Sequence, residues 1–274
     1  MSAEAESSGG HSVEIAPEHV LEIGEFAVPN TMTGTLLVSF FIIVFALLVR
    51  RKAGIIPTRL QVLFESLFVF FLDKLEEGLG EKRARKLVPL VMTLFMFILV
   101  SNQLILIPLV GSITSPHGPF FRTPTTDYSA TIALAISVVV LSHVLALFVS
   151  PLGHIGNYFR VAGFFDILRR KRPPGDLLTV FIEFFLGLLE IIGDLGKIVS
   201  LATRLFGNIF AGEAVIIIIS GLLFVTQFFV PIPFIVLASF AGLIQAFVFS
   251  LLTILFISNN IVHASHQAER SEAH

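Results

Sequence analysis

Arg204 is the residue in this sequence with the clearest capacity for chemistry, because its charge lies deep inside an apolar run. The run extends over 46 residues, from 177 to 222, and Arg204 lies at least 18 residues from either end. A charge at such a depth in a membrane costs at least ~2.5 to 3.5 kcal/mol. We therefore expect Arg204 to face a partner or water and to stabilise an anion there. The competing interpretation is an arginine paired structurally within its own helix bundle.

Charged residues precede Arg204 at intervals of seven: Glu183, Glu190 and Lys197. Seven residues of α-helix return to within about 20° of the same face, so these side chains form one polar stripe that leads to the arginine. A stripe of structural ion pairs would use the same residue types.

Beyond Arg204 the polar positions divide between two faces. Asn208 lies about 40° from Arg204, whereas Glu213 projects to roughly the opposite face. Gly207 and Ala211 are small neighbours on the arginine's side, and small residues let another helix approach closely. Such a helix has polar residues on two sides. This arrangement suits an ion path in two unconnected halves, one that approaches Arg204 from the inside along the polar stripe and one that reaches Glu213 from the outside.

A second long apolar run, residues 231–263, carries its own heptad. Its members are Ala238, Gln245, Leu252 and Asn259. If the two runs form a helical hairpin, Gln245 can face Arg204 across it.

The composition places these residues in an all-α polytopic membrane protein. Of the 274 residues, 55% are hydrophobic, 14% are charged and 29 are Phe, and the mean hydropathy is +0.90, far from the balance of soluble proteins. The chain has no cysteine, which excludes disulfides, thiolate metal sites and cysteine nucleophiles.

Five membrane-crossing helices and one interfacial helix account for the apolar runs. The crossings are expected at about 31–49, 87–110, 129–150, 177–222 and 231–262, within a single membrane domain of residues 31–263. Residues 59–75 alternate apolar and charged side chains, which predicts an amphipathic helix at the membrane surface. Residues 1–30 are a polar acidic segment, and residues 264–274 are a polar tail.

The distribution of Lys and Arg gives the orientation. No basic residue occurs in 1–49, nine occur in 50–86, one in 111–128, five in 151–175, none in 223–232 and one after 263. Basic loops mark the cytoplasmic side, so we expect the N-terminus outside and the C-terminus inside.

The last two apolar runs are too long for upright crossings. As a helix, residues 177–222 would extend about 69 Å, against ~30 Å of hydrocarbon. We predict two long, strongly tilted helices that form a hairpin, since ordinary tilts near 20° do not absorb the excess. Two shorter helices in each run are the alternative.

Other polar residues in the apolar runs have simpler interpretations. Ser101, Asn102 and Gln103 are typical of hydrogen bonds between helices. His143 is more typical of a bundle contact than of a proton relay. The histidines of the C-terminal HASHQAERSEAH favour a solvated tail over a metal site. We expect neither a metal nor a cofactor.

The sequence around Arg204 resembles a known family. The run SLATRLFGNIFAGE, followed by GLIQAFVFSLLTILF, is similar to the hallmark of subunit a of F-type ATP synthases, the membrane stator subunit that faces the rotating ring of subunit c. The stretches NQLILIPLVG and PTTDYSATIALAI add to the resemblance, which covers about residues 30–262. The RLFGN and GLIQAF motifs at this separation are highly specific.

The resemblance implies roles for individual residues. Arg204 corresponds to the family's essential arginine, and Gln245 to the glutamine opposite it. The other implied members of the proton path are Glu213, Asn208, Glu190, Lys197, Ser200 and Asp127, with Asp127 near the outer entrance; Glu183, Asn259 and His143 are further candidates. Some members carry an ionisable side chain seven residues before the glutamine, where this chain has Ala238.

The implied function is that of an ion-translocating stator subunit. It would provide two offset proton half-channels to the ring of subunit c and couple proton flow to rotation and ATP synthesis, without itself being catalytic. The implied partners are the ring, the peripheral-stalk subunit b and the lipid bilayer, in a bacterial plasma membrane. The chain lacks a G-x-x-x-x-G-K-[ST] loop, so we expect it to bind no nucleotide, and we expect no nucleic acid.

A stand-alone secondary transporter, whose buried arginine binds an anionic substrate, is the alternative from another class. Such folds often have inverted repeats with paired broken helices, and the sequence shows no matching second half. A purely structural membrane scaffold would require Arg204 to tolerate replacement.

Overall fold

The computed structural model describes residues 19–23, 26–52, 58–104, 114–115, 118–119, 122–151, 154, 177–222 and 230–272. Its helices are α1 (Asn30–Lys52), α2 (Arg59–Leu79), α3 (Glu81–Leu104), η1 (Pro124–Thr126), α5 (Tyr128–Val149), α8 (Leu177–Leu222) and α9 (Pro231–Glu272). Two small antiparallel hairpins accompany them: β1 (His19–Ile23) with β2 (Phe26–Pro29), and β3 (Thr114–Ser115) with β4 (Gly118–Pro119). The predicted all-α class is confirmed.

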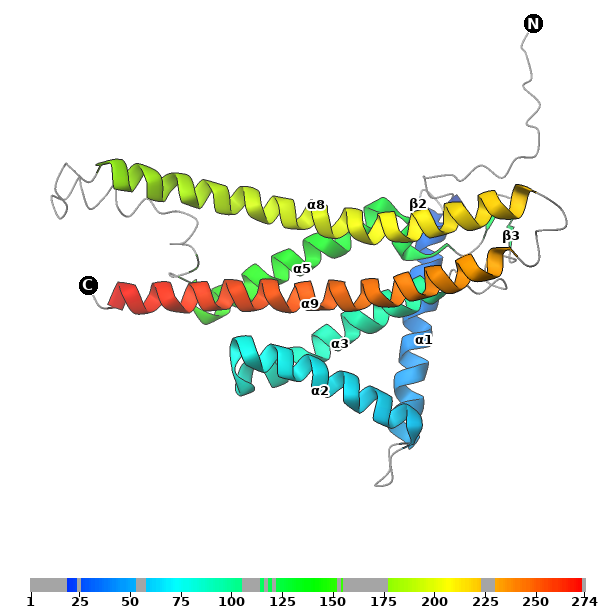
Figure 1. Ribbon diagram of the computed structural model, residues 1–274, viewed down its shortest axis with the longest axis horizontal. Helices are drawn as coiled ribbons and strands as arrows, with labels where there is room; N and C mark the ends of the chain where they lie inside the picture. The colour runs from blue at the N-terminus through cyan, green and yellow to red at the C-terminus, as the bar shows by residue number, and fades with distance from the viewer. Residues whose placement is uncertain are drawn as a thin grey trace, which may run out of the picture.

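α8 and α9 are the longest elements and lie side by side along the longest dimension of the molecule (Figure 1). α8 is one helix of 46 residues over the predicted range, so the alternative of two shorter helices is wrong for this run. α9 has 42 residues and ends at Glu272, ten residues past the expected end of the crossing, so much of the predicted polar tail is helical. The predicted helical hairpin is present.

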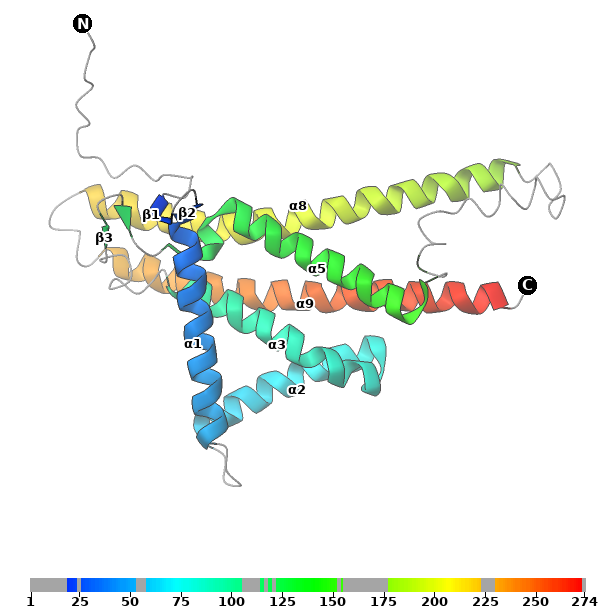
Figure 2. The same ribbon diagram turned by 180° about the vertical axis from the view of Figure 1, so that it is seen from behind.

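The chain is a multi-pass membrane protein. Four of the described helices are long and apolar enough to cross a bilayer: α1, α3, α5 and the 35-residue part of α9 from Pro231 to Ser265. α8, the fifth predicted crossing, is not among these four helices; it carries six charged residues along its length. α1 runs across the direction of α8 and α9, while α3 and α5 cross them obliquely (Figure 2). If α1 stands upright in the bilayer, α8 and α9 are strongly inclined.

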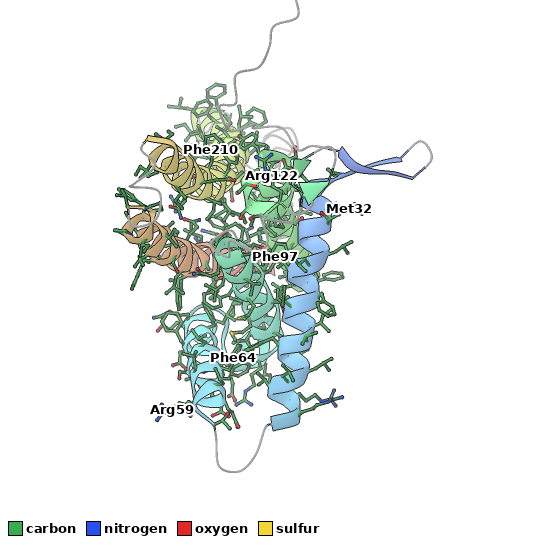
Figure 3. All side chains as sticks on the ribbon, turned by 90° about the vertical axis from the view of Figure 1, so that its right-hand side faces the viewer. Met32, Arg59, Phe64, Phe97, Arg122 and Phe210 are labelled. Carbon is green, nitrogen blue, oxygen red and sulfur yellow. The ribbon has the colours of Figure 1, made fainter. Side chains whose placement is uncertain are left out.

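Basic residues that the sequence assigns to opposite sides of the membrane lie near opposite ends of α1. Arg122 lies near the start of α1, close to Met32, and Arg59 lies near the other end of this helix (Figure 3). Arg59 belongs to the segment with nine basic residues, and Arg122 is the single basic residue of residues 111–128.

α2 begins at a capped turn and buries one side. The Thr58 hydroxyl accepts a hydrogen bond from the Gln61 amide, and Gly80 ends the helix with a φ of 75°, a conformation that glycine adopts without strain. Phe71, Leu75 and Leu79 are buried against α3 and α9. The predicted helix over 59–75 therefore extends to Leu79.

The core lies where α2, α3, α5, α8 and α9 converge. Phe71, Phe95 and Phe247, from α2, α3 and α9, form an aromatic contact group with ring centroids 4.7 to 6.0 Å apart. Leu201 and Leu205 bring the inward side of α8 into the same core. This packing fixes which side of α8 remains outside the bundle.

Amide side chains bind α3 to α9, as the sequence predicts for residues 101–103. Asn102 Nδ2 donates to the Gly242 carbonyl over 3.1 Å, Gln103 Nε2 donates to the Ser239 carbonyl over 3.1 Å, and the Ser239 hydroxyl donates to Gln103 Oε1 over 2.8 Å. A β-carbon at Gly242 would lie 3.0 Å from Asn102 Cβ, so this glycine permits the close approach.

Replacing Gly242 by valine is expected to force α3 and α9 apart and to destabilise the chain by about 1 to 3 kcal/mol, the usual cost of overpacking. Thermal unfolding of the detergent-solubilised chain, followed by circular dichroism, measures the effect. Gly193→Val is the matched control, because a β-carbon there would meet no atom within 4 Å. Equal stability of the two variants would contradict the close packing at Gly242.

Candidate functional site

Arg204 lies on the exposed side of α8, away from the core residues Leu201 and Leu205. Among the described residues, no side chain forms an ion pair or a hydrogen bond with its guanidinium. The interpretation of a structural pair within its own bundle therefore finds no partner in the described part of the chain. Arg204 is positioned to receive an anion from outside the chain.

Small residues surround Arg204 and form the open face of α8, which we define as Gly193, Gly196, Ser200, Arg204, Gly207 and Ala211. These positions recur every three or four residues and therefore share one side of the helix. A β-carbon at any of the three glycines would meet no atom within 4 Å, and Ser200 and Ala211 are exposed. The open face lets another helix approach the α8 backbone closely.

The contacts between α8 and α9 set the level of Gln245. Asn208 Nδ2 donates to the Ala241 carbonyl over 3.1 Å, and a β-carbon at Gly212 would lie 3.4 Å from Ala238 Cβ. In an antiparallel pair, four residues forward on one helix match about four residues back on the other. The register therefore places Gln245 level with Arg204, as the sequence predicts. Gln245 is only 5% exposed, and its Nε2 has no described partner.

Glu213 occupies a partly covered position beyond Arg204. One carboxylate oxygen, Oε2, is buried and has no described hydrogen-bond partner. Ala238 lies beside Gly212 and therefore at the level of Glu213. At this position, where the resembled family can have an ionisable side chain, the chain presents only a methyl group.

Asp127 is buried at the start of α5, and both of its carboxylate oxygens are engaged. Oδ1 accepts from the Ser129 amide over 2.8 Å, which caps the helix, and Oδ2 accepts from the Thr31 hydroxyl of α1 over 3.2 Å. The family resemblance implies that this residue lies near the outer entrance, and this stays a prediction. In the structure its contacts hold α1 against α5.

A group of buried polar atoms has no partner in the described part of the chain. It comprises Asn30 Oδ1 and Nδ2, Ser101 Oγ, Asn102 Oδ1, Thr125 Oγ1, Ser258 Oγ, Glu213 Oε2 and Gln245 Nε2. All except Ser258 belong to the start of α1, η1, the end of α3 and the parts of α8 and α9 near Arg204 and Glu213. Buried polar groups of this kind usually bind ordered water.

On the N-terminal side of Arg204, Lys197 is not a free member of the heptad stripe. Its ammonium donates to Asp194 Oδ1 over 2.6 Å and lies 5.4 Å from the centroid of the Phe256 ring. The sequence analysis missed Asp194, which lies outside the heptad. Its spacing of three residues from Lys197 was the available signal, since residues i and i+3 are neighbours on a helix.

His143 joins the same group from α5. Its Nε2 lies 3.5 Å from Asp194 Oδ2, and its Nδ1 lies 3.3 Å from Asn260 Nδ2, which also donates to the Ser142 hydroxyl over 2.8 Å. His154, which the sequence analysis also missed, places its ring centroid 5.3 Å from that of His143. Burial lowers the pKa of His154.

The remaining predicted residues lie in varied surroundings. Glu190 is partly buried, while Ser200 and Asn259 are exposed. The side chain of Glu183 lies outside the described residues. On α9, Asn260 rather than its neighbour Asn259 makes the contacts with α5.

Residues 32–258 match the family described as ATP synthase A chain. The chain belongs to this family. The match covers the whole of α8, with Arg204, and α9 as far as Ser258. The family is that of the membrane-embedded, ion-translocating subunit of an ATP synthase.

Relatives named ATP synthase subunit a resemble the chain over most of its length. The protein from Moorella thermoacetica is 32% identical over 246 residues, which cover 89% of this chain and 96% of the relative. The ATP synthase subunit a 1 of Pelobacter propionicus is 32% identical over 91% of this chain and 93% of its own length. A relative from Propionigenium modestum, named as sodium ion specific, is 28% identical over 93% of this chain and 82% of its own length.

Replacing Asp127 by alanine is expected to cost about 1 to 3 kcal/mol of stability, because α5 loses its N-cap and α1 loses a hydrogen bond. The measurement is thermal unfolding in detergent. Asp73→Ala, an exposed acid of α2, is the control and is expected to leave stability within about 0.5 kcal/mol. If Asp127→Ala unfolded at the same temperature as the wild type, these contacts would not hold α1 against α5.

Proposed function

We propose that this ATP synthase subunit provides two offset proton half-channels to a ring of subunit c and that Arg204 separates them. The observation that carries the proposal is the exposed guanidinium on the open face of α8, which has no partner among the described residues. Such a charge is suited to an anion that arrives and leaves with another subunit.

A carboxylate on a ring helix suits this position. The glycines of the open face let the ring helix approach, and an opposite charge within a few ångströms favours the ionised carboxylate. A ring site that comes to Arg204 therefore gives up its proton, and after passing it can be protonated again. The fixed positive charge also repels protons and so opposes a direct leak between the halves.

The outer half-channel is proposed to run past Glu213 towards Gln245. Buried polar atoms without described partners occur in Asn30, Thr125, Glu213, Asn102 and Gln245, and water bound to them would carry protons. Glu213 then delivers the proton to a ring carboxylate. Ala238 supplies no ionisable partner, so water serves that part of the path.

The inner half-channel is proposed to approach Arg204 along the N-terminal half of α8, where Glu190 and Lys197 lie. Each proton that crosses 100 mV supplies about 2.3 kcal/mol, which rotation of the ring passes to the catalytic sector. The peripheral-stalk subunit b would hold this chain still against the ring. The proposed orientation, in a bacterial plasma membrane, places the N-terminus outside and the C-terminus inside.

Replacing Arg204 by alanine is expected to reduce ATP-driven proton pumping to about a hundredth or less, in line with the loss of one preorganised electrostatic group. Pumping is measured by dye quenching in inverted membrane vesicles. Arg85→Ala, whose side chain is 67% exposed in a surface pair with Glu81, is the control. Pumping by an assembled Arg204→Ala complex would refute the proposed function.

Replacing Glu213 by glutamine is expected to slow proton flux at least about ten-fold, since the amide no longer exchanges a proton, while the ring still assembles with the chain. Passive flux through vesicles stripped of the catalytic sector gives the rate, and co-purification of the ring gives assembly. Glu77→Gln, an exposed residue of α2, is the matched control. A flux equal to wild type would remove Glu213 from the path.

The relative named as sodium ion specific makes Na⁺ the alternative ion. Pumping that persists at the same rate when Na⁺ is withdrawn from the medium supports protons, and pumping that stops without Na⁺ supports the alternative.

A further inference from the structure

A cluster of polar side chains, four of them ionisable, joins α5, α8 and α9 on the N-terminal side of Arg204. We define it as the inner cluster: His143, His154, Asp194, Lys197 and Asn260. Lys197 precedes Arg204 by seven residues and Asp194 by ten, which correspond to about 10 and 15 Å along the helix axis. The cluster thus lies on the side of Arg204 that the proposed function assigns to proton release.

The contacts suggest where the protons of the resting cluster lie. With Asn260 Nδ2 taken as the donor, His143 Nδ1 accepts, and we assign the imidazole proton to Nε2, directed at Asp194 Oδ2. The other oxygen of Asp194 accepts from Lys197 Nζ. Asp194 thus lies between a basic side chain and the imidazole.

The surroundings of His143 suit a group that gains and loses protons. Among the described residues, the groups that face it are Asp194 and Lys197 of α8, His154 after α5, and on α9 Asn260, which does not titrate. The side chains of His143 and Lys197 are 24% and 34% exposed, whereas that of Asp194 is 10% exposed. The carboxylate is nearly covered and the imidazole remains accessible.

We propose that His143 is a proton acceptor of the inner half-channel and that Asp194, held by Lys197, stabilises its imidazolium form. This inference rests on the proposed function, which supplies the protons on this side of Arg204. It adds a residue of α5 and an acid outside the heptad stripe to the path.

The proton transfer balances within the cluster. A proton leaves the ring carboxyl, crosses by water, and bonds to His143 Nδ1, and the resulting imidazolium donates from Nε2 to Asp194. For this the Asn260 amide turns, so that its oxygen instead of its nitrogen faces Nδ1. The imidazolium then releases one proton to water on the inner side, next to His154, and the resting state returns.

An unperturbed histidine changes charge between about pH 5 and 8, which glutamate, aspartate and lysine do not. A cluster that only braces α5 against α8 needs His143 as a hydrogen-bond donor, which glutamine can also provide. His143→Gln therefore separates the two roles, because it preserves a donor to Asp194 and removes the titration.

The test measures passive proton flux through the assembled membrane sector in inverted vesicles, where the bath contacts the inner face and its pH is set directly. Wild type is expected to show an inflection of the flux between about pH 5 and 8. His143→Gln is expected to lose this inflection and to slow the flux by about ten-fold or more. Asp194→Asn is expected to slow it as well, and Asp194→Glu to restore part of it.

His263→Gln is the matched control, because His263 is an exposed histidine of α9 outside the inner cluster. A His143→Gln complex with the flux and pH profile of wild type would overturn the inference. If that variant does not assemble, the wild-type profile still decides, since a flux independent of bath pH between about pH 5 and 8 contradicts a titrating histidine on the path.

The inference and the proposed function fail in different ways. Loss of pumping in Arg204→Ala together with a normal His143→Gln complex rejects the inner cluster alone. Pumping that survives in Arg204→Ala rejects the half-channel function itself, whatever the result at His143.

Discussion

The positive charge of Arg204 has no counter-charge among the described residues of its own chain, and this imbalance organises the rest of the structure. A charge at membrane depth costs at least ~2.5 to 3.5 kcal/mol unless water or a partner compensates for it. The core packing of Leu201 and Leu205 turns the arginine outward, and the neighbouring glycines keep that side clear. In the proposed function, a ring carboxylate would supply the missing counter-charge.

The two sides of Arg204 differ in how they hold polar groups. Beyond it, Glu213 and Gln245 have buried atoms without described protein partners, a condition that water satisfies. Before it, Asp194 has both oxygens engaged by side chains, from Lys197 and His143. On the proposed path, the side with Glu213 would conduct through water, and the side with Asp194 would hold a proton on a defined group. Long helices suit this division, because one continuous α8 passes both sides.

Sequence reasoning found the features that depend on periodicity. The apolar run of α8 gave its length, and the shared heptad gave the level of Gln245 opposite Arg204. It missed Asp194 and His154. The spacing of Asp194 from Lys197 was visible in the sequence, but the contact of Asp194 with His143 joins α8 to α5, and no spacing within one helix reveals such a contact. His154 lies beyond the end of α5, where no helical spacing relates it to His143. The polar stripe was also simpler than the structure, in which Lys197 is bound to Asp194. Packing between helices depends on side-chain shape at each crossing, which periodicity does not encode.

Disulfide formation between α8 and a ring helix tests most directly whether the open face of α8 meets the ring. The chain has no cysteine, so an introduced one is unique. A disulfide requires Cα atoms within about 7 Å, and cysteines placed at successive depths along a ring helix cover every level of α8. Gly207→Cys, beside Arg204, is predicted to cross-link in the assembled complex, whereas Leu195→Cys, exposed on the opposite side of α8, is predicted not to. Cross-linking from Leu195→Cys alone, or from neither position in an assembled complex, would contradict the role of Arg204.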